Sequence, residues 1–298
     1  EPDVITAWRT VLGHHARRAF NPREIETIRR EVLPSLPCEQ AEIGIISPYN
    51  EQVNALHREL GEGIDVATVH KFQGREKEAI ILSTVDDQIT AFTDDPNLLN
   101  VAVSRAKRQF TLVTSSNEQP DSRDIADLLA YIDYNGGKIT ESTIHSVFDM
   151  LYEPYAEARR EFLKRHRRIS EFDSENLIYA LLEQVLEAEP AFRYLGVLCH
   201  QPLRQLIRDW TLLNDEERRY ASNGATHLDF LIYNRVSKRP VLAIETDGYQ
   251  FHKQGTRQSE RDRMKDRILD RYALPLLRLS TTGTDEEAKI KDQLSKIV

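Results

Sequence analysis

The sequence predicts an α/β protein with at least two domains. Its 298 residues are enough for two domains of ordinary size. In residues 1–117, short apolar runs of strand length alternate with segments of helical periodicity, which is typical of a parallel sheet covered by helices. In residues 171–298, a helical segment precedes three strand-like runs, a second helix and a final strand. This order predicts a separate αβββαβ unit.

Four apolar runs in the first 117 residues have the length and composition of buried strands. They are residues 43–46, 66–69, 79–83 and 110–113. A helix is expected to begin at Asn21, because Pro22 lies in its first turn and apolar residues follow with helical spacing. A second helix is expected over residues 52–60. Residues 1–20 show no clear pattern.

Residues 118–170 are expected to form a helical connector. A helix over residues 124–134 should end at Asn135-Gly136-Gly137, and a short helix is expected over residues 143–151. A third helix, residues 156–168, is strongly basic, and contact with nucleic-acid phosphates would suit it. The alternative is a charged connecting helix without a ligand. The cations are Arg159, Arg160, Lys164, Arg165, Arg167 and Arg168.

The third segment begins with a helix near Asp173, where Ser174 also suits a helix cap. The remaining elements are expected as a strand over 194–199, two strands around a turn, a helix over 259–272, a strand over 276–279 and a closing helix from Asp285. Glu175 lies in the first turn of the opening helix. It is expected either to stabilise the helix dipole or to point toward a metal site.

The two central strands predict a hairpin that brings acidic residues together. Residues 230–233 and 241–244 are apolar and flank a polar turn. If the hairpin is symmetric about Ser237, Asp229 lies directly opposite Glu245. Close carboxylates raise each other's pKa unless a positive charge lies between them. The alternative is a surface hairpin whose acids are simply solvated.

Two further residues would extend this cluster. Asp247 lies two positions after Glu245 and should face the same way along the strand. His252 follows with an imidazole that titrates near neutral pH. A divalent cation with oxygen ligands suits such a cluster, because Mg²⁺ accepts one or two carboxylates together with water and phosphate.

The pattern Asp229, Ile244-Glu245-Thr246-Asp247-Gly248 and His252 resembles the PD-(D/E)XK nuclease superfamily, and especially its very-short-patch-repair-like branch. The resemblance covers roughly the last third of the chain and implies a restriction-endonuclease-like fold. It implies that Asp229 and Glu245 bind Mg²⁺ or Mn²⁺, with Asp247 and Glu175 as further ligands. The expected activity is metal-dependent hydrolysis of phosphodiester bonds in DNA.

The sequence departs from this family at one position. Asp247 stands where the family places a lysine. Lys265 or Arg261 would then replace that lysine, or His252 would act as the acid or base. The departure leaves open a second reading, in which the nuclease fold is degenerate and does not cut.

Three blocks in the first 117 residues resemble the second RecA-like domain of superfamily 1 helicases, in the branch of the nonsense-mediated-decay helicase. They are I-I-S-P-Y with Gln52, T-V-H-K-F-Q-G-R-E-K over residues 68–77, and N-V-A-V-S-R-A-K over residues 100–107. By this resemblance Arg105 is an arginine finger that stabilises charge on the γ-phosphate of ATP.

The same resemblance assigns further roles around the nucleotide. Glu76 would contact its ribose, and Gln52 and Gly74 would belong to the ATP-binding residues. Gln73 and Gly74 would couple ATP to the nucleic-acid-binding face, which would include Arg75. The alternative for Arg75 and the lysines beside it is a solvated surface.

Half of the expected ATPase is missing from the sequence. It contains no G-x-x-x-x-G-K-[ST] phosphate loop and no strand that ends in Asp-Glu to hold magnesium. ATP binding and hydrolysis are therefore expected only with a preceding motor domain or a partner chain. Because the chain begins with Glu1 rather than Met, we expect a fragment of a longer protein.

Composition sets the remaining expectations. The net charge of −8 argues against a uniformly basic surface, although local patches decide nucleic-acid binding. Cys38 and Cys199 lie far apart and suit a reducing, cytoplasmic compartment. No apolar run approaches the roughly 20 residues of a membrane span, so no membrane partner is expected.

These observations predict the C-terminal half of a helicase–nuclease. The expected domains are a RecA-like motor domain (1–117), a helical connector (118–170) and a nuclease domain (171–298). DNA is favoured over RNA as substrate, and phage defence is a setting suggested by association alone. The alternatives are an ATP-driven DNA or RNA remodeller with a non-cutting nuclease fold, and a nucleic-acid-binding subunit that recruits another enzyme.

Overall fold

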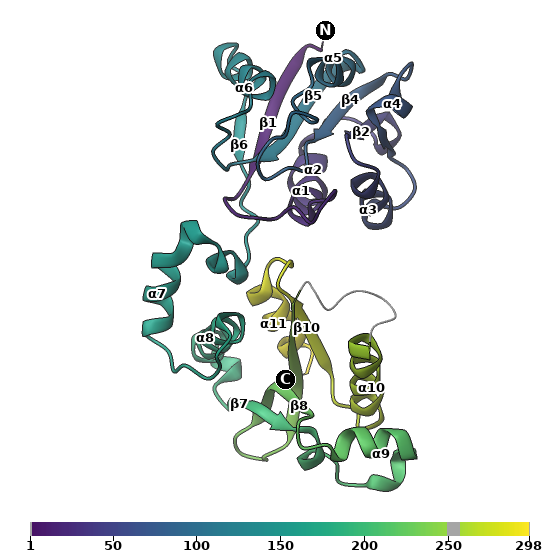
Figure 1. The fold of residues 1–298 in the computed structure, drawn as a ribbon. Coiled ribbons are helices and arrows are strands. Elements are labelled where there is room, and N and C mark those ends of the chain that lie inside the picture. The colour runs from purple at the N-terminus through teal and green to yellow at the C-terminus, as the bar shows by residue number, and fades with distance from the viewer. Residues whose placement is uncertain (1, 249–256, 298) are drawn as a thin grey trace. The chain divides into compact units, whose positions relative to one another are not determined.

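The computed structural model describes residues 2–248 and 257–297 and divides the chain into two compact units (Figure 1). The first unit spans Glu1–His145 and the second spans Ser146–Val298. The first contains a six-stranded parallel sheet and the second a four-stranded mixed sheet, each with helices. The predicted α/β class is confirmed. In the described part of the chain, no helix is long and apolar enough to span a membrane.

The strands of the first unit are arranged in the order β3-β2-β4-β5-β1-β6, and every adjacent pair is parallel. Their bounds are β1 Val4–Thr10, β2 Ile43–Ser47, β3 Asp65–Thr68, β4 Lys77–Ser83, β5 Ala106–Ser115 and β6 Ile139–Glu141. The four predicted strands are all present. β1 and β6 were missed, because β1 mixes polar with apolar residues and β6 is a three-residue edge strand.

Helices cover both faces of this sheet. They are α1 Pro22–Thr27, α2 Leu33–Ser35, α3 Asn50–Leu60, α4 Val69–Phe72, α5 Pro96–Ser104 and α6 Asp124–Tyr134, with a π-helical turn over Ile28–Val32. Successive residues of β4 point to opposite faces. Ile80 packs in a core with residues of α5 and α6. Ile81 packs in a second core with residues of α1 and α3.

The segment predicted as a connector, residues 118–170, is divided between the two units. In the first unit, α6 buries Ile125 and Ile132 against the sheet, and β6 pairs with β1. In the second, the segment predicted as a helix over 143–151 forms a 3-10 helix, Val147–Leu151. The amide of Val147 donates to the carboxylate of Glu286 at 3.0 Å, which ties this segment to the second unit.

The second unit has the predicted αβββαβ order, with one helix inserted. Its elements are α7 Ala156–Lys164, α8 Asp173–Ala188, β7 Leu195–Pro202, α9 Asp215–Ser222, β8 His227–Asn234, β9 Pro240–Asp247, α10 Arg257–Arg271, β10 Leu276–Ser280 and α11 Glu286–Ser295. The insertion α9, which the sequence analysis missed, lies between β7 and β8. At the start of α8 the capping position is Phe172 rather than Asp173, and no side chain caps the helix.

The second sheet has the order β10-β9-β8-β7. β7, β8 and β9 are antiparallel neighbours, and β10 runs parallel to β9. One face packs against α8 and α11, with Ile232 and Ile244 in the shared core. The opposite face packs against α9 and α10, with Leu231 and Ala243 in the shared core. Both faces of the central hairpin are therefore covered by helices.

A buried hydrogen-bond network joins α1 to the end of β4. Glu24 has no exposed surface. Its carboxylate oxygens accept hydrogen bonds from the Ser83 hydroxyl at 2.5 Å, the Thr84 hydroxyl at 3.1 Å and the Val85 amide at 3.0 Å. Burial raises the pKa of Glu24 to about 8, although these donors act in the opposite direction.

We expect this carboxyl group to make stability fall as the pH rises toward 8. Because the folded pKa is above the ordinary value of 4.5, the stabilisation is complete below pH 4.5 and is lost through the folded pKa. The measurement is the thermal unfolding midpoint between pH 5 and 8.5 for wild type and Glu24→Gln. The variant should lack this pH-dependent component, and the exposed control Glu51→Gln should keep it. An equal pH dependence in wild type and Glu24→Gln would contradict the assignment.

Candidate functional site

The hairpin of the second unit has the register predicted from the sequence. Phe230 pairs with Ile244, so Asp229 and Glu245 occupy the next facing positions on β8 and β9. The Asp229 amide lies 3.4 Å from Oε1 of Glu245, and the Thr246 amide donates to Oδ2 of Asp229 at 2.8 Å. The predicted register is confirmed for Asp229 and Glu245, although a register shift between Ile232 and Tyr233 breaks the expected symmetry about Ser237 nearer the turn.

A lysine on α10 contacts this pair. Nζ of Lys265 lies 2.5 Å from Oε2 of Glu245 and donates to the His227 carbonyl oxygen at 2.9 Å. Glu245 is 6% exposed and Lys265 is 8% exposed. Burying an ion pair costs desolvation energy that apolar packing would not cost. A buried pair of this kind therefore indicates a candidate functional site rather than a device for stability. Of the two cations left open by the sequence, Lys265 is the one that contacts Glu245.

Both carboxyl groups have raised pKa values. Burial raises the pKa of Glu245 to about 7, with Asp229 adding to the increase and Lys265 opposing it. Burial also raises the pKa of Asp229, against the hydrogen bond from the Thr246 amide. A raised pKa was predicted, but the main cause is burial rather than the expected repulsion between the acids.

Asp247 lies at the same end of the sheet and is paired with an arginine. Its Oδ1 lies 3.0 Å from the guanidinium of Arg278 on β10, and the same arginine contacts Asp266 at 2.6 Å. Arg278 stands beside Glu245 in the parallel β9–β10 ladder. Arg278 was not predicted as a site residue, although a charged residue within an apolar strand was the available signal.

Glu175 reaches the site from the start of α8, as the sequence analysis expected. Its Oε2 lies 2.9 Å from Nε2 of His200, and its charge contributes to the raised pKa of Asp229. His200 lies on β7 with a positive φ of 50°, at the position facing Asp229. His200 was not predicted as a site residue; it immediately follows the strand predicted over residues 194–199.

The four acids and Lys265 line one hollow of about 280 Å³, named here the carboxylate hollow. Its lining includes Glu175, His227, Asp229, Glu245, Asp247 and Lys265, together with Arg261 and Tyr220. Across residues 2–248 and 257–297, no three His, Cys, Asp or Glu side chains are grouped to hold a metal ion. The expected four-carboxylate set is therefore not assembled. Three acids have their own partners: Lys265 for Glu245, Arg278 for Asp247 and His200 for Glu175. His252 lies outside the described residues.

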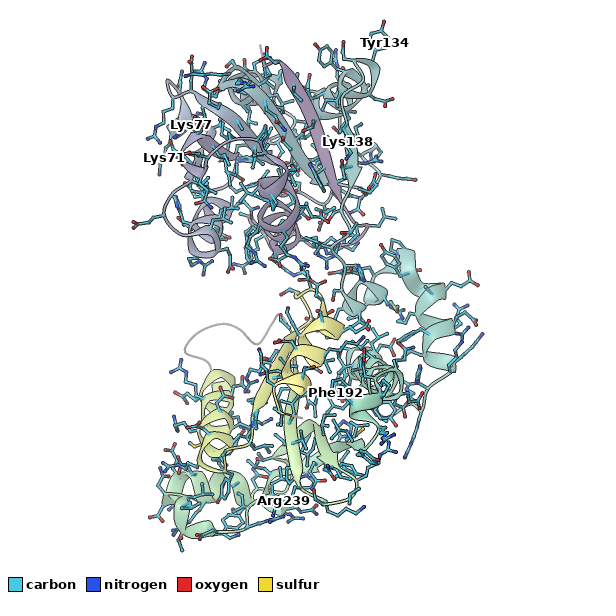
Figure 2. The ribbon with its side chains drawn as sticks, turned by 180° about the vertical axis from the view of Figure 1, so that it is seen from behind. Lys71, Lys77, Tyr134, Lys138, Phe192 and Arg239 are labelled. Atoms are coloured by element: carbon cyan, nitrogen blue, oxygen red, sulfur yellow. The ribbon has the colours of Figure 1, made fainter. Side chains whose placement is uncertain are left out.

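In the first unit, the second and third sequence blocks meet at the amino ends of β4 and β5. Residues 73–76 are exposed, and Gly74 has a positive φ of 84° that favours glycine. The Lys77 amide donates to the Arg105 carbonyl oxygen at 3.1 Å. Glu76 and Arg105 therefore lie at the same edge of the sheet. Figure 2 shows Lys71 and Lys77 on one flank of this unit and Lys138 on the other.

Arg105 is available for a ligand. Its guanidinium contacts the neighbouring Ser104 hydroxyl at 3.1 Å and forms no ion pair with any described residue. Arg75, by contrast, pairs with Asp65 at 3.0 Å. An arginine finger needs a guanidinium that is free to meet a phosphate, and Arg105 meets that requirement.

Gln52 does not lie with these residues. It is 0% exposed and follows β2, at the carboxyl edge of the sheet rather than the amino edge. Its Oε1 accepts from the Asn21 amide at 2.8 Å, and its Nε2 donates to the Ser83 hydroxyl at 2.8 Å. The expected contact between Gln52 and ATP is therefore not available here. Gln52 instead belongs to the buried network around Glu24.

The basic helix predicted over residues 156–168 ends at Lys164, and three of the four residues assigned there to nucleic-acid binding face solvent. Arg160, Lys164 and Arg165 are exposed. Arg159 instead donates to the carbonyl oxygens of Met150 and Leu151, both at 2.9 Å. This side chain therefore anchors α7 to the preceding segment.

Two family models match the chain in sequence. Residues 9–117 match a family described as AAA domain, and residues 172–297 match one described as protein of unknown function, DUF2726.

Several named helicases are similar in sequence to about a third of the chain. The chain is 39% identical over 101 residues to an uncharacterized ATP-dependent helicase of Methanocaldococcus jannaschii, covering 33% of this chain and 15% of that protein. It is 39% identical over 114 residues to the DNA polymerase alpha-associated DNA helicase A of Saccharomyces cerevisiae, covering 35% and 16%. It is 43% identical over 105 residues to the regulator of nonsense transcripts 1 of Dictyostelium discoideum, covering 31% and 8%.

These matches agree with the resemblance found in the helicase blocks, and the chain spans a small part of each relative's length. The DUF2726 description assigns no activity to the second unit. Residues 9–117 are therefore an AAA domain of the superfamily 1 helicase type, and residues 172–297 are a DUF2726 domain.

Proposed function

We propose that this chain is part of an ATP-dependent helicase whose second unit hydrolyses phosphodiester bonds in DNA with a divalent metal ion. The observation that supports this most directly is the buried contact between Glu245 and Lys265, with Asp229 in the facing position. The two acids at one end of the hairpin would bind a metal cation. Lys265 of α10 would offset negative charge on the scissile phosphate.

The donor set of the carboxylate hollow fits a small divalent cation. Mg²⁺ is satisfied by one or two protein carboxylates when water and phosphate complete its shell. Asp229 and Glu245 would hold the ion, and their raised pKa values show that the buried site disfavours uncompensated negative charge. A bound metal would supply a water of lowered pKa and neutralise charge on the phosphate.

The other residues of the hollow would orient the substrate. Lys265 contacts Glu245, and its ammonium group has further protons that would donate a hydrogen bond to a phosphate oxygen. Arg261 lines the same hollow and offers a second cation. Burial raises the pKa of Tyr220 to about 12, so its hydroxyl stays protonated and can donate a hydrogen bond. Asp247 would act through Arg278, by holding that guanidinium at the rim.

The first unit would supply one side of an ATP site. Arg105 and Glu76 lie at one edge of the sheet, where they would meet ATP held by a motor domain outside this chain. DNA is favoured as the substrate, because the relatives include a protein named as a DNA helicase. ATP turnover would then move the nucleic acid relative to the second unit.

The experiment is a cleavage assay with the full chain and a labelled DNA oligonucleotide. We expect products with MgCl₂ or MnCl₂ and none with EDTA, because the carboxylates would lack their cation. Single-stranded and duplex substrates should be tested separately, since the strand requirement decides how a motor would present DNA. Metal-independent cleavage, or none with either metal, would contradict the proposal.

A second function is favoured by two observations. The described residues contain no three-ligand metal group, and Asp247 is occupied by Arg278. This suits an ATP-driven remodeller whose second unit binds nucleic acid without cutting it. Tight DNA binding without cleavage in either metal would support this function over the nuclease.

A further inference from the structure

The second unit contains another hollow, of about 350 Å³, between α7 and the start of α8. This basic hollow is lined by five arginine and lysine side chains and one carboxylate. They are Arg159, Arg160, Lys164, Arg167, Arg168 and Asp173. Its volume lies within the range of about 300–1,000 Å³ that is usual for ligand pockets. The charge balance favours an anionic ligand.

The loop that carries Arg167 and Arg168, between α7 and α8, is held in place from inside. Asn176, which is buried on α8, accepts hydrogen bonds through Oδ1 from the amides of Ile169 and Ser170 at 2.9 and 3.1 Å. Its Nδ2 donates to the carbonyl oxygens of Ser170 and Phe172, both at 3.0 Å. His166 contacts Glu183 at 3.0 Å. A fixed loop loses little conformational entropy when a ligand binds.

The cations of the basic hollow are not equally available. Arg159 is held by backbone carbonyls and by Asp173 at 3.4 Å. Lys164 contacts Glu161 in an exposed pair, which contributes little. Arg160 and Arg167 form no hydrogen bond or ion pair with any described residue, and both are exposed. Two free guanidinium groups, each a rigid fork of donors, suit phosphate oxygens.

An exposed aromatic residue is next in sequence to Asp173, which lines the basic hollow. Phe172 directly precedes Asp173 and is 66% exposed. Its amide donates to the Ser170 hydroxyl at 3.2 Å, so the backbone that carries the ring belongs to the fixed loop. A phosphate-binding groove with a neighbouring aromatic ring is typical of proteins that bind single strands, because unpaired bases stack on such rings.

We propose that the basic hollow binds single-stranded nucleic acid, with Arg160 and Arg167 on the phosphates and Phe172 stacked on a base. Duplex fits less well, because its base faces are covered by their neighbours in the stack. The proposal goes beyond cleavage: it concerns binding, it uses none of the residues of the carboxylate hollow, and it needs no metal.

The test measures binding of a fluorescent single-stranded oligonucleotide to the full chain by anisotropy, in EDTA, from 50 to 300 mM salt. In Arg160→Gln/Arg167→Gln the slope of log K against log salt should flatten by about 1.4, since each phosphate contact on a single strand contributes about 0.7. Phe172→Ala should weaken binding roughly fivefold or more through lost stacking. DNA and RNA strands serve as separate arms, because both present phosphates and bases.

A matched control removes two arginines at another surface. Arg235 and Arg239 lie on the exposed hairpin turn, where Figure 2 shows Arg239, and their double Gln variant has the same net charge as the test variant. Binding by this control should stay close to wild type. Equal slopes in the test and control variants would overturn the proposal, as would unchanged binding by Phe172→Ala or equal competition by an acidic peptide. Because the assay contains EDTA and measures binding alone, its result does not depend on the cleavage proposal.

Discussion

Replacing Glu245 by Gln is expected to reduce metal-dependent DNA cleavage by well over 100-fold. Gln keeps the shape of the side chain but removes the negative charge that would hold the cation. Changes to outer partners of metal ligands typically cost about 10- to 100-fold, so loss of a direct ligand should cost more. Asp229→Asn should have a similar effect, since Asp229 faces Glu245 across the hairpin. The measurement is the single-turnover cleavage rate of the full chain.

The control must separate chemistry from folding. In Glu245→Gln, Lys265 would keep a buried charge without its acid, which is destabilising. Glu245→Gln/Lys265→Met removes both charges, and its thermal midpoint should recover while cleavage remains lost. Asp292→Asn changes an exposed acid on α11 and should leave the rate unchanged. A folded Glu245→Gln or Asp229→Asn that cleaves at nearly the wild-type rate would show that the carboxylate hollow is not the catalytic centre.

The sequence predicted this end of the hairpin because the relevant information is local. Two apolar runs flank one polar turn, so the midpoint of that turn near Ser237 constrains which residues of the two strands face each other. That constraint was sufficient to place Asp229 opposite Glu245, as the observed register shows. The partners of the acids were harder to foresee. Arg278 comes from β10 and His200 from β7, and only the order of the strands brings them to the hairpin.

In the first unit, too, the sequence did not predict how distant segments come together. The helicase blocks identified the family, yet their order along the chain did not reveal which edge of the sheet each one occupies. Gln52 follows β2 at the carboxyl edge, whereas Arg105 precedes β5 at the amino edge. β1 was missed because its polar residues obscure the apolar run of a central strand, although parallel neighbours pair with it on both sides. Pairing between distant segments decided these features, and local propensity did not.

Replacing Arg105 by Ala is expected to reduce ATP turnover by about 10³-fold or more once the missing motor half is supplied. The chain alone should show no turnover, because its sequence lacks the phosphate loop that would hold ATP. In the complemented protein, charge accumulates on the transferring phosphate, and the free guanidinium of Arg105 is placed to offset it. The measurement is steady-state phosphate release, with nucleotide affinity determined separately.

A second variant, Arg105→Lys, tests whether a positive charge alone is sufficient for ATP turnover. Lysine retains the positive charge but lacks the planar fork that donates two parallel hydrogen bonds to phosphate oxygens. Turnover should therefore remain well below wild type in Arg105→Lys, while Arg75→Gln, which loses an exposed pair with Asp65, should retain ATP hydrolysis. Near-normal turnover in Arg105→Ala would remove this residue from the ATP site. The amino edge of β4 and β5 would then be a candidate surface for nucleic acid rather than for nucleotide.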